Sequence, residues 1–83
     1  MKEKEIIKIK EKKYIILTTT NYHNIHYAFA NELDNNEEPT NTYFIFYETE
    51  KQDLVLLNDK SILDKLIPIF QKILKETINK IIN

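Results

Sequence analysis

Few side chains of this 83-residue chain are of the kinds that catalyse reactions, and each of them has a structural alternative. Nucleophilic catalysis needs an activated serine, threonine, cysteine or lysine beside a base. Ser61 is the only serine, and Asp64 follows it by three residues at the start of a run with helical period, a pattern typical of a helix N-cap. Thr18, Thr19 and Thr20 belong to a run of residues that favour strands, and the chain has no cysteine. These residues therefore predict structural positions and no nucleophile.

The two histidines are the only candidates for a transition-metal site. His23 and His26 lie three residues apart, but a usable site needs a third ligand and none stands at a diagnostic spacing. The acidic segment with Asp34, Glu37 and Glu38 does not have the spacing of a calcium loop. Calcium loops and phosphate-binding loops also use glycine, which is absent from the chain. We therefore assign no catalytic, metal-binding or cofactor-binding residue, and we expect no enzyme and no cofactor.

Charge and hydropathy exclude further classes of protein. The net charge is −1, and the six lysines among the first thirteen residues alternate with glutamates, which indicates a charged edge strand more than a phosphate-binding arm. Nucleic acid is therefore not an expected partner. No segment approaches the roughly 20 apolar residues of a membrane helix, and no signal peptide is visible. We expect no membrane association and a cytoplasmic location.

The apolar pattern predicts one α+β domain over residues 1–83. Its period is 2 as far as residue 58 and 3.6 from residue 61 onward. Predicted strands cover 5–10, 13–20, 25–31, 42–48 and 54–57, with a loop over 34–41, and a predicted helix covers 61–82. We expect a meandering antiparallel sheet of four to five strands (1–58), packed on one face by one C-terminal helix (60–82).

Two local features qualify this prediction. Pro68 lies inside the predicted helix, where its ring collides with the preceding turn, so we expect a kink or a break there. The chain has no glycine, so we expect asparagine to supply the left-handed conformations of the turns, as in the segment 21–24.

The order of these segments resembles a known family. "YIIL" leads into "YAFA", an acidic linker leads to "YFIFYE", and then come "LVLLND" and "ILDKLIPIFQKIL". This order is similar to the YrzB-like family of small acidic proteins of low-GC Gram-positive bacteria and their mobile elements. The likeness covers roughly Lys8 to Glu76, with Tyr27 and the strand from Tyr43 to Tyr47 as its best anchors. It supports the fold and implies no catalytic residue.

The chain carries more apolar surface than one small core uses. The apolar arc of the predicted helix exceeds the roughly 100–140° that packing on a sheet needs. One sheet face receives either Tyr43, Ile45 and Tyr47 or Phe44 and Phe46, unless the first strand and the loop 34–41 fold over it. The residues predicted to contact a partner are Tyr43, Ile45, Tyr47, Ile67, Leu74, Ile78 and Ile82.

These residues suggest a non-enzymatic protein-interaction module that binds a protein partner or itself, as a homodimer. An alternative is a small inhibitor, encoded on a mobile element, that occludes a host protein. Another is a single-stranded nucleic-acid binder that stacks bases on the Tyr/Phe face of the sheet.

Overall fold

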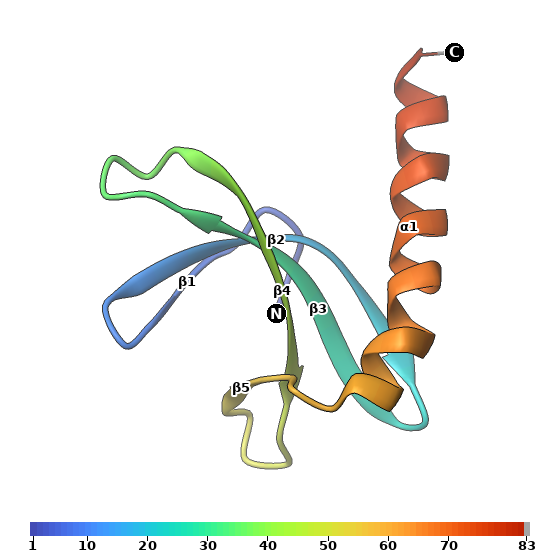
Figure 1. The fold of residues 1–83 in the computed structure, drawn as a ribbon, viewed down its shortest axis with the longest axis horizontal. Coiled ribbons are helices and arrows are strands. Elements are labelled where there is room, and N and C mark those ends of the chain that lie inside the picture. Colours follow the sequence, from blue (N-terminus) through green and yellow to red (C-terminus); the bar gives the residue numbers. More distant parts are fainter. Residues whose placement is uncertain (83) are drawn as a thin grey trace.

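The computed structural model describes residues 1–82 of the chain, with side chains described as far as Glu76. Its elements are β1 (Ile6–Ile9), β2 (Lys12–Tyr22), β3 (Ile25–Leu33), β4 (Pro39–Glu48), β5 (Leu54–Leu56) and α1 (Lys60–Ile82). The five strands form one antiparallel sheet in chain order, β1-β2-β3-β4-β5. The predicted α+β fold, a meandering sheet with one C-terminal helix, is confirmed (Figure 1).

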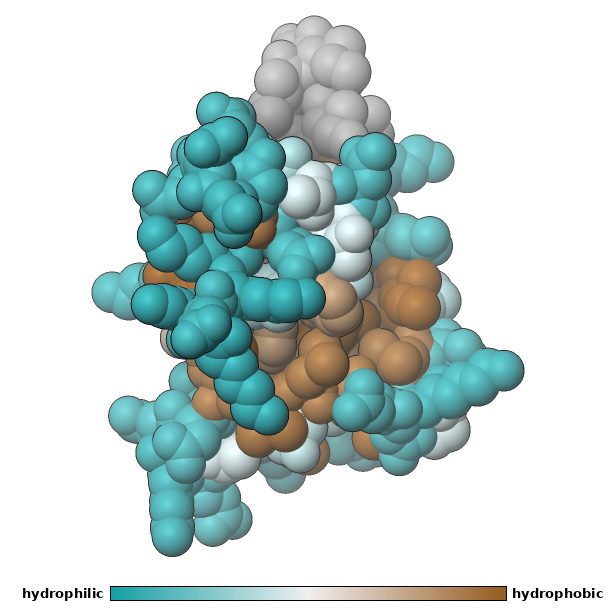
Figure 2. All heavy atoms as spheres, turned by 60° about the vertical axis from the view of Figure 1, so that its left-hand side comes forward, coloured by the Kyte–Doolittle hydropathy of each residue, from teal (hydrophilic) through white to brown (hydrophobic). Residues whose placement is uncertain are grey.

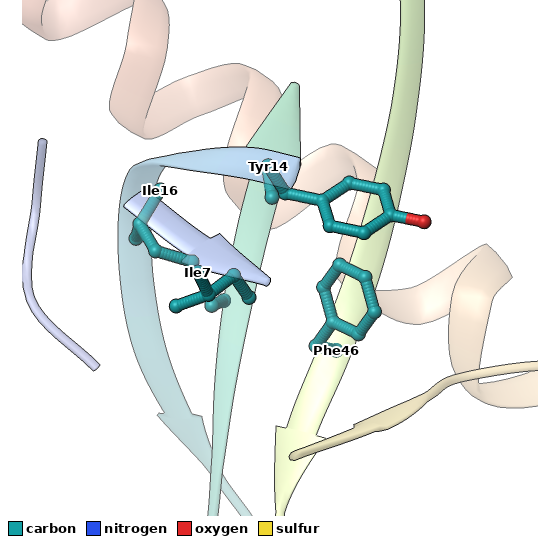
Figure 3. Close-up of a cluster of buried hydrophobic side chains, with 6 residues drawn as sticks. Ile7, Tyr14, Ile16 and Phe46 are labelled. Atoms are coloured by element: carbon teal, nitrogen blue, oxygen red, sulfur yellow. The ribbon is translucent and has the colours of Figure 1, made fainter. Parts of the chain in front are cut away.

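The sheet curls strongly on the face away from the helix. Tyr14 of β2 packs against Phe46 of β4, with ring centroids 5.0 Å apart (Figure 3). It also packs against Phe44 of β4, with ring centroids 5.6 Å apart. In a flat sheet, two strands that are separated by a third strand lie about 9.5 Å apart. Between them on this face, the β3 residues that pair with Phe46 and Phe44 are Ala28 and Ala30, and both are fully buried. These small side chains let β2 fold across β3 to reach β4.

A β-bulge contributes to this curl. Ile16 pairs with Ala30 and Thr18 pairs with Phe29, so Leu17 is an extra residue opposite β3. A bulge bends its strand and increases the local twist. Ile16 therefore packs in the core formed under the curled β1–β2 hairpin, while Thr18, two residues later, is buried next to Phe29 on the face that the helix covers.

The helix packs on the opposite face and forms a second core. Leu66 and Phe70 of α1 are fully buried against Tyr27, Ile45 and Leu57. The helix therefore covers the face that carries the tyrosines of β4, and the first two strands cover the face with the phenylalanines. Of the two arrangements left open by the sequence, the structure has the first strand over the phenylalanine face, since Ile7 of β1 belongs to the same buried cluster as Phe46. The loop does not take part in this cover, because residues 34–38 are exposed.

The helix spans Lys60–Ile82, as predicted, and is not broken at Pro68. Asp59 caps it: its Oδ1 accepts hydrogen bonds from the Ser61 backbone N–H (3.0 Å) and the Ser61 hydroxyl (2.7 Å). The assignment of Ser61 as the cap is therefore wrong. Pro68 lies inside a continuous α1 and supplies no N–H to the carbonyl of Asp64, a residue that is exposed and can bind water instead.

The turns use residues other than asparagine in left-handed conformations. The hairpin between β1 and β2 turns at Lys10 and Glu11, with φ of 50° and 71°. The hairpin between β2 and β3 turns at His23 and Asn24, with φ of 51° and 65°. Positive φ at both residues of a two-residue loop is the requirement of a type I′ turn, whose twist matches that of the strands. Asparagine supplies only one of these four positions, so the prediction about turn residues is wrong in the main.

Strand β4 also begins earlier than predicted. Pro39 pairs with Leu33 of β3, which places the last residues of the expected loop inside the strand. The buried Asn31 holds this segment, because its side-chain N–H₂ donates to the carbonyls of Thr40 (2.7 Å) and Thr42 (3.0 Å). A side-chain amide thus replaces backbone pairing where the register of β3 and β4 shifts.

Candidate protein-interaction groove

The side chains that could do chemistry do not gather in one place. The Ser61 hydroxyl donates to the helix cap, and Thr18 is buried in the sheet. The Nδ1 of His26 lies 2.7 Å from the Oδ1 of Asn21, and the ring of His23 packs on Tyr22. Within the part of the chain that the structure describes, no three His, Cys, Asp or Glu side chains are placed to hold a metal ion.

An apolar groove of about 410 Å³ lies between β4, the chain after β5 and the first turns of α1. We call it the β4–α1 groove. Its lining residues are Phe29, Tyr43, Phe44, Ile45, Leu56, Leu57, Asn58, Leu63 and Ile67. None of them is charged, and Asn58 is the one amide among them.

The short β5 strand creates this groove. Strand β5 pairs with β4 only from Phe46 to Glu48, and one further bond joins the Leu57 N–H to the Ile45 carbonyl (2.8 Å). The chain then turns away at Asn58 and enters α1. Beyond Ile45, toward Tyr43, the outer edge of β4 therefore has no neighbouring strand among residues 1–82.

The open edge of β4 presents unpaired backbone groups next to the groove. Successive residues of a strand point their N–H and C=O groups to alternate edges. The Ile45 carbonyl points toward β5, because it accepts the Leu57 N–H, and the Thr42 carbonyl points toward β3, where Asn31 donates to it. The N–H and C=O groups of Tyr43 therefore point to the outer edge of β4, away from β3. The N–H of Ile45 points to the same edge. No hydrogen bond to these three groups is found within the described residues.

Stacked rings build the wall of the groove on the sheet side. Phe29 stacks on Tyr43 at 5.4 Å and on Phe70 at 5.5 Å, so that three aromatic rings run from β4 to α1. Leu63 and Ile67 form the helical side, one turn apart on the same face of α1. Phe70 is buried, and the rings therefore tie the helix to the sheet and fix the position of both walls.

Three side chains at the rim of the groove remain in contact with solvent. Tyr43 is 50% exposed, Ile67 43% and Leu56 38%. Binding sites for small ligands are typically concave and lined mainly by apolar and aromatic side chains, as this groove is. A space-filling view shows how hydrophobic atoms collect in the centre of one side of the molecule, between hydrophilic side chains (Figure 2).

Another hollow of about 500 Å³ lies between the edges of β1 and β5. Ile9 and Leu54 line it, but so do the charged side chains of Lys10 and Lys12. Its position shows that the curled sheet brings its first and last strands toward one another. Its mixed lining makes it a weaker candidate for an apolar ligand than the β4–α1 groove.

The structure brings together some of the residues predicted to contact a partner. Tyr43 and Ile67 both line the β4–α1 groove and are exposed. Ile45 also lines the groove, but its side chain is only 5% exposed and belongs to the core under α1. Tyr47 and Leu74 are half-buried, and Tyr47 packs on Tyr27. Two more predicted residues, Ile78 and Ile82, lie outside the described side chains.

Sequence reasoning missed Leu56, Leu63 and Phe29 as groove residues. Leu56 belongs to a run of four consecutive apolar residues, 54–57. The observed strand β5 has only three residues and buries only part of this run. Leu63 is half-buried against the core under α1, but it also borders the opening. Hydropathy alone gave no signal for Phe29, because its place depends on where the helix crosses the sheet.

Two ionisable groups below the helix have shifted pKa values. Hydrogen bonds from the Ser61 hydroxyl and from the backbone of Ile62 and Ser61 lower the pKa of the Asp59 carboxyl. Burial under α1 raises the pKa of the Tyr27 phenol above its usual value near 10. Asp59 therefore stays ionised at neutral pH and Tyr27 stays neutral, which suits a helix cap and a core residue.

Within residues 1–82, no helix combines the length and the apolar character that crossing a membrane requires. Comparisons with family models, with curated proteins and with solved structures give no match to this chain. The likeness to the YrzB-like family therefore stays a prediction.

Proposed function

We propose that this chain is a non-enzymatic protein-interaction module that binds a partner protein through the β4–α1 groove. The observation that carries the proposal is the joint exposure of Tyr43, Leu56 and Ile67 around an uncharged hollow. Covering apolar surface stabilises a complex by about 25 cal/mol per Å². The rigid ring stack holds the groove open in the free protein, so binding orders few side chains and loses little entropy.

The potentially reactive side chains described next make structural contacts, and this supports a non-enzymatic role. The Ser61 hydroxyl and the Asp59 carboxylate cap α1. The Glu32 carboxylate pairs with Lys12 at 3.3 Å, and Glu37 pairs with Lys13 at 3.1 Å. Apart from the Tyr43 phenol, the side chains that line the β4–α1 groove include no acid, base or nucleophile.

The nucleic-acid alternative loses its main support. Base stacking needs an open aromatic face. Tyr27 and Phe46, one on each face of the sheet, are each 2% exposed, because α1 covers one face and the curled β1–β2 hairpin covers the other. An inhibitor that occludes a host protein would use the same groove as any other binding module, and only the partner distinguishes the two.

A peptide-display selection tests the proposal. Random dodecapeptides on phage are selected against the immobilised parent chain, against Ile67→Lys, and against Ile25→Lys as a matched control. Ile25 is 38% exposed in the β2–β3 hairpin and lies outside the groove. Circular dichroism first confirms that both variants fold. We expect peptides enriched on the parent and on Ile25→Lys to be lost on Ile67→Lys; no enrichment, or equal enrichment on all three, contradicts the proposal.

A further inference from the structure

We propose that the partner enters the β4–α1 groove as an extended apolar strand that pairs with the open edge of β4 at Tyr43. This inference rests on the proposed interaction function and specifies the kind of ligand. Addition of a strand to an exposed sheet edge is a recurrent mode of peptide recognition, in which main-chain hydrogen bonds give affinity and pockets for alternate side chains give specificity.

The backbone of β4 defines the conformation of the ligand. The outward N–H and C=O of Tyr43 and the N–H of Ile45 are donors and acceptors in the geometry of a sheet ladder, and they lie where a longer β5 would pair. An extended chain satisfies all three groups. A ligand helix satisfies none of them, because its own backbone groups are already bonded within the helix.

The lining of the groove defines the side chains of the ligand. Tyr43 and Ile45 point to the helix side of the sheet, whereas Phe44 points to the other side, yet all three line the same hollow. Only an open edge exposes both faces of a strand in this way. A strand added there directs every second side chain toward Leu63 and Ile67. Because no charged residue lines the groove, these alternate side chains should be apolar.

The size of the exposed rim favours a single strand over a second copy of this chain. Tyr43, Leu56 and Ile67 together expose about 260 Å² at most, if each is given the roughly 200 Å² of an aromatic side chain. A stable dimer buries about 800 Å² on each partner. A peptide strand needs far less apolar area, because its backbone contributes hydrogen bonds to β4 as well.

The test uses the peptide most enriched on the parent chain in the selection described above. Each backbone amide of that peptide is N-methylated in turn, which removes one hydrogen-bond donor and leaves every side chain unchanged. Binding to the parent chain is measured by fluorescence anisotropy. We expect apolar residues at alternate positions of the enriched sequences. Methylation of the amide that donates to the Tyr43 carbonyl should weaken binding at least about tenfold, and methylation of the amides on either side of it, which point away from β4, less than about threefold.

The outcomes separate this inference from the proposed function. If enrichment depends on Ile67 but apolar residues recur with helical spacing, or if no amide is more sensitive to methylation than its two neighbours, strand addition is wrong while groove binding stands. If no peptide depends on Ile67, both fall. Sedimentation velocity of the chain alone adds one outcome. Dimers that Ile67→Lys dissociates and Ile25→Lys preserves would make a second copy the occupant and overturn the inference.

Discussion

Replacing Leu66 by alanine should remove a large part of the stability of this domain. Leu66 is fully buried where α1 meets the sheet, in a cluster with Phe70, Ile45, Tyr27 and Leu57. Truncating a buried leucine removes apolar contacts and leaves a cavity that closes only in part, at a cost of about 2–5 kcal/mol. We expect a value near 3 kcal/mol, because the aromatic neighbours are held by ring contacts and cannot collapse freely into the space.

This loss is large beside the total stability. A chain of 83 residues should have a free energy of unfolding of about 4–12 kcal/mol. In a domain of this size, each kcal/mol lowers the thermal midpoint by about 4–8 °C. The Leu66→Ala variant should therefore melt about 12–24 °C below the parent.

Ile67 supplies the matched control because it is the next residue on the same helix and is 43% exposed. The Ile67→Ala change loses less buried area and gains helix propensity, so we expect a cost of at most about 1 kcal/mol. Urea unfolding followed by circular dichroism gives the loss of unfolding free energy for both variants. The dependence of this free energy on urea concentration should be the same as in the parent. If Leu66→Ala costs less than about 1 kcal/mol, or no more than Ile67→Ala, then α1 does not pack on the sheet as described here.

Three further substitutions test local features. Pro68→Ala should stabilise the domain by about 1–3 kcal/mol in urea unfolding, because it restores a helical hydrogen bond at an exposed position; a loss of stability would show that the ring makes contacts that the description of α1 omits. Asn31→Ala should cost about 2–3 kcal/mol in the same assay, since two β4 carbonyls lose their donor, and a cost below about 0.5 kcal/mol would contradict that role. The pKa of Asp59 is lowered in the folded chain, so its contribution is complete above the unfolded pKa of about 3.9 and fades as the pH falls through the folded value. Asp59→Asn should therefore weaken the fall of the thermal midpoint between about pH 5 and pH 2, and an unchanged pH profile would argue against the cap.

The elements could be predicted from the sequence because they depend on local patterns. The change of apolar period near residue 60 separates the strands from the helix, and the structure places the helix at Lys60–Ile82. The cap was misplaced by two residues because Asp59 and Ser61 are both good cap residues, and only the direction of the hydrogen bond tells them apart.

The curl of the sheet and the groove depend on contacts that the sequence does not display. The bulge at Leu17 carries no glycine or proline signal, and the contact of Tyr14 with Phe46 depends on alanines in the strand between them. Strand alternation predicts that Ile45 and Tyr43 lie on the same face of the sheet. In the structure α1 covers Ile45 and leaves Tyr43 exposed. Where a helix crosses a sheet is decided by packing over the whole domain, so the rim of the groove could be predicted only in part.

Amide hydrogen exchange, measured residue by residue by NMR, tests the binding role of the β4 edge most directly. In the free chain the N–H groups of Tyr43 and Ile45 face solvent and should exchange quickly. With a saturating groove-binding peptide, both amides should become protected, and the largest chemical-shift changes should fall on them and on Leu63 and Ile67. Unchanged exchange at Tyr43 and Ile45, with the shifts clustered on β1 or on the β2–β3 hairpin instead, would contradict binding at this edge.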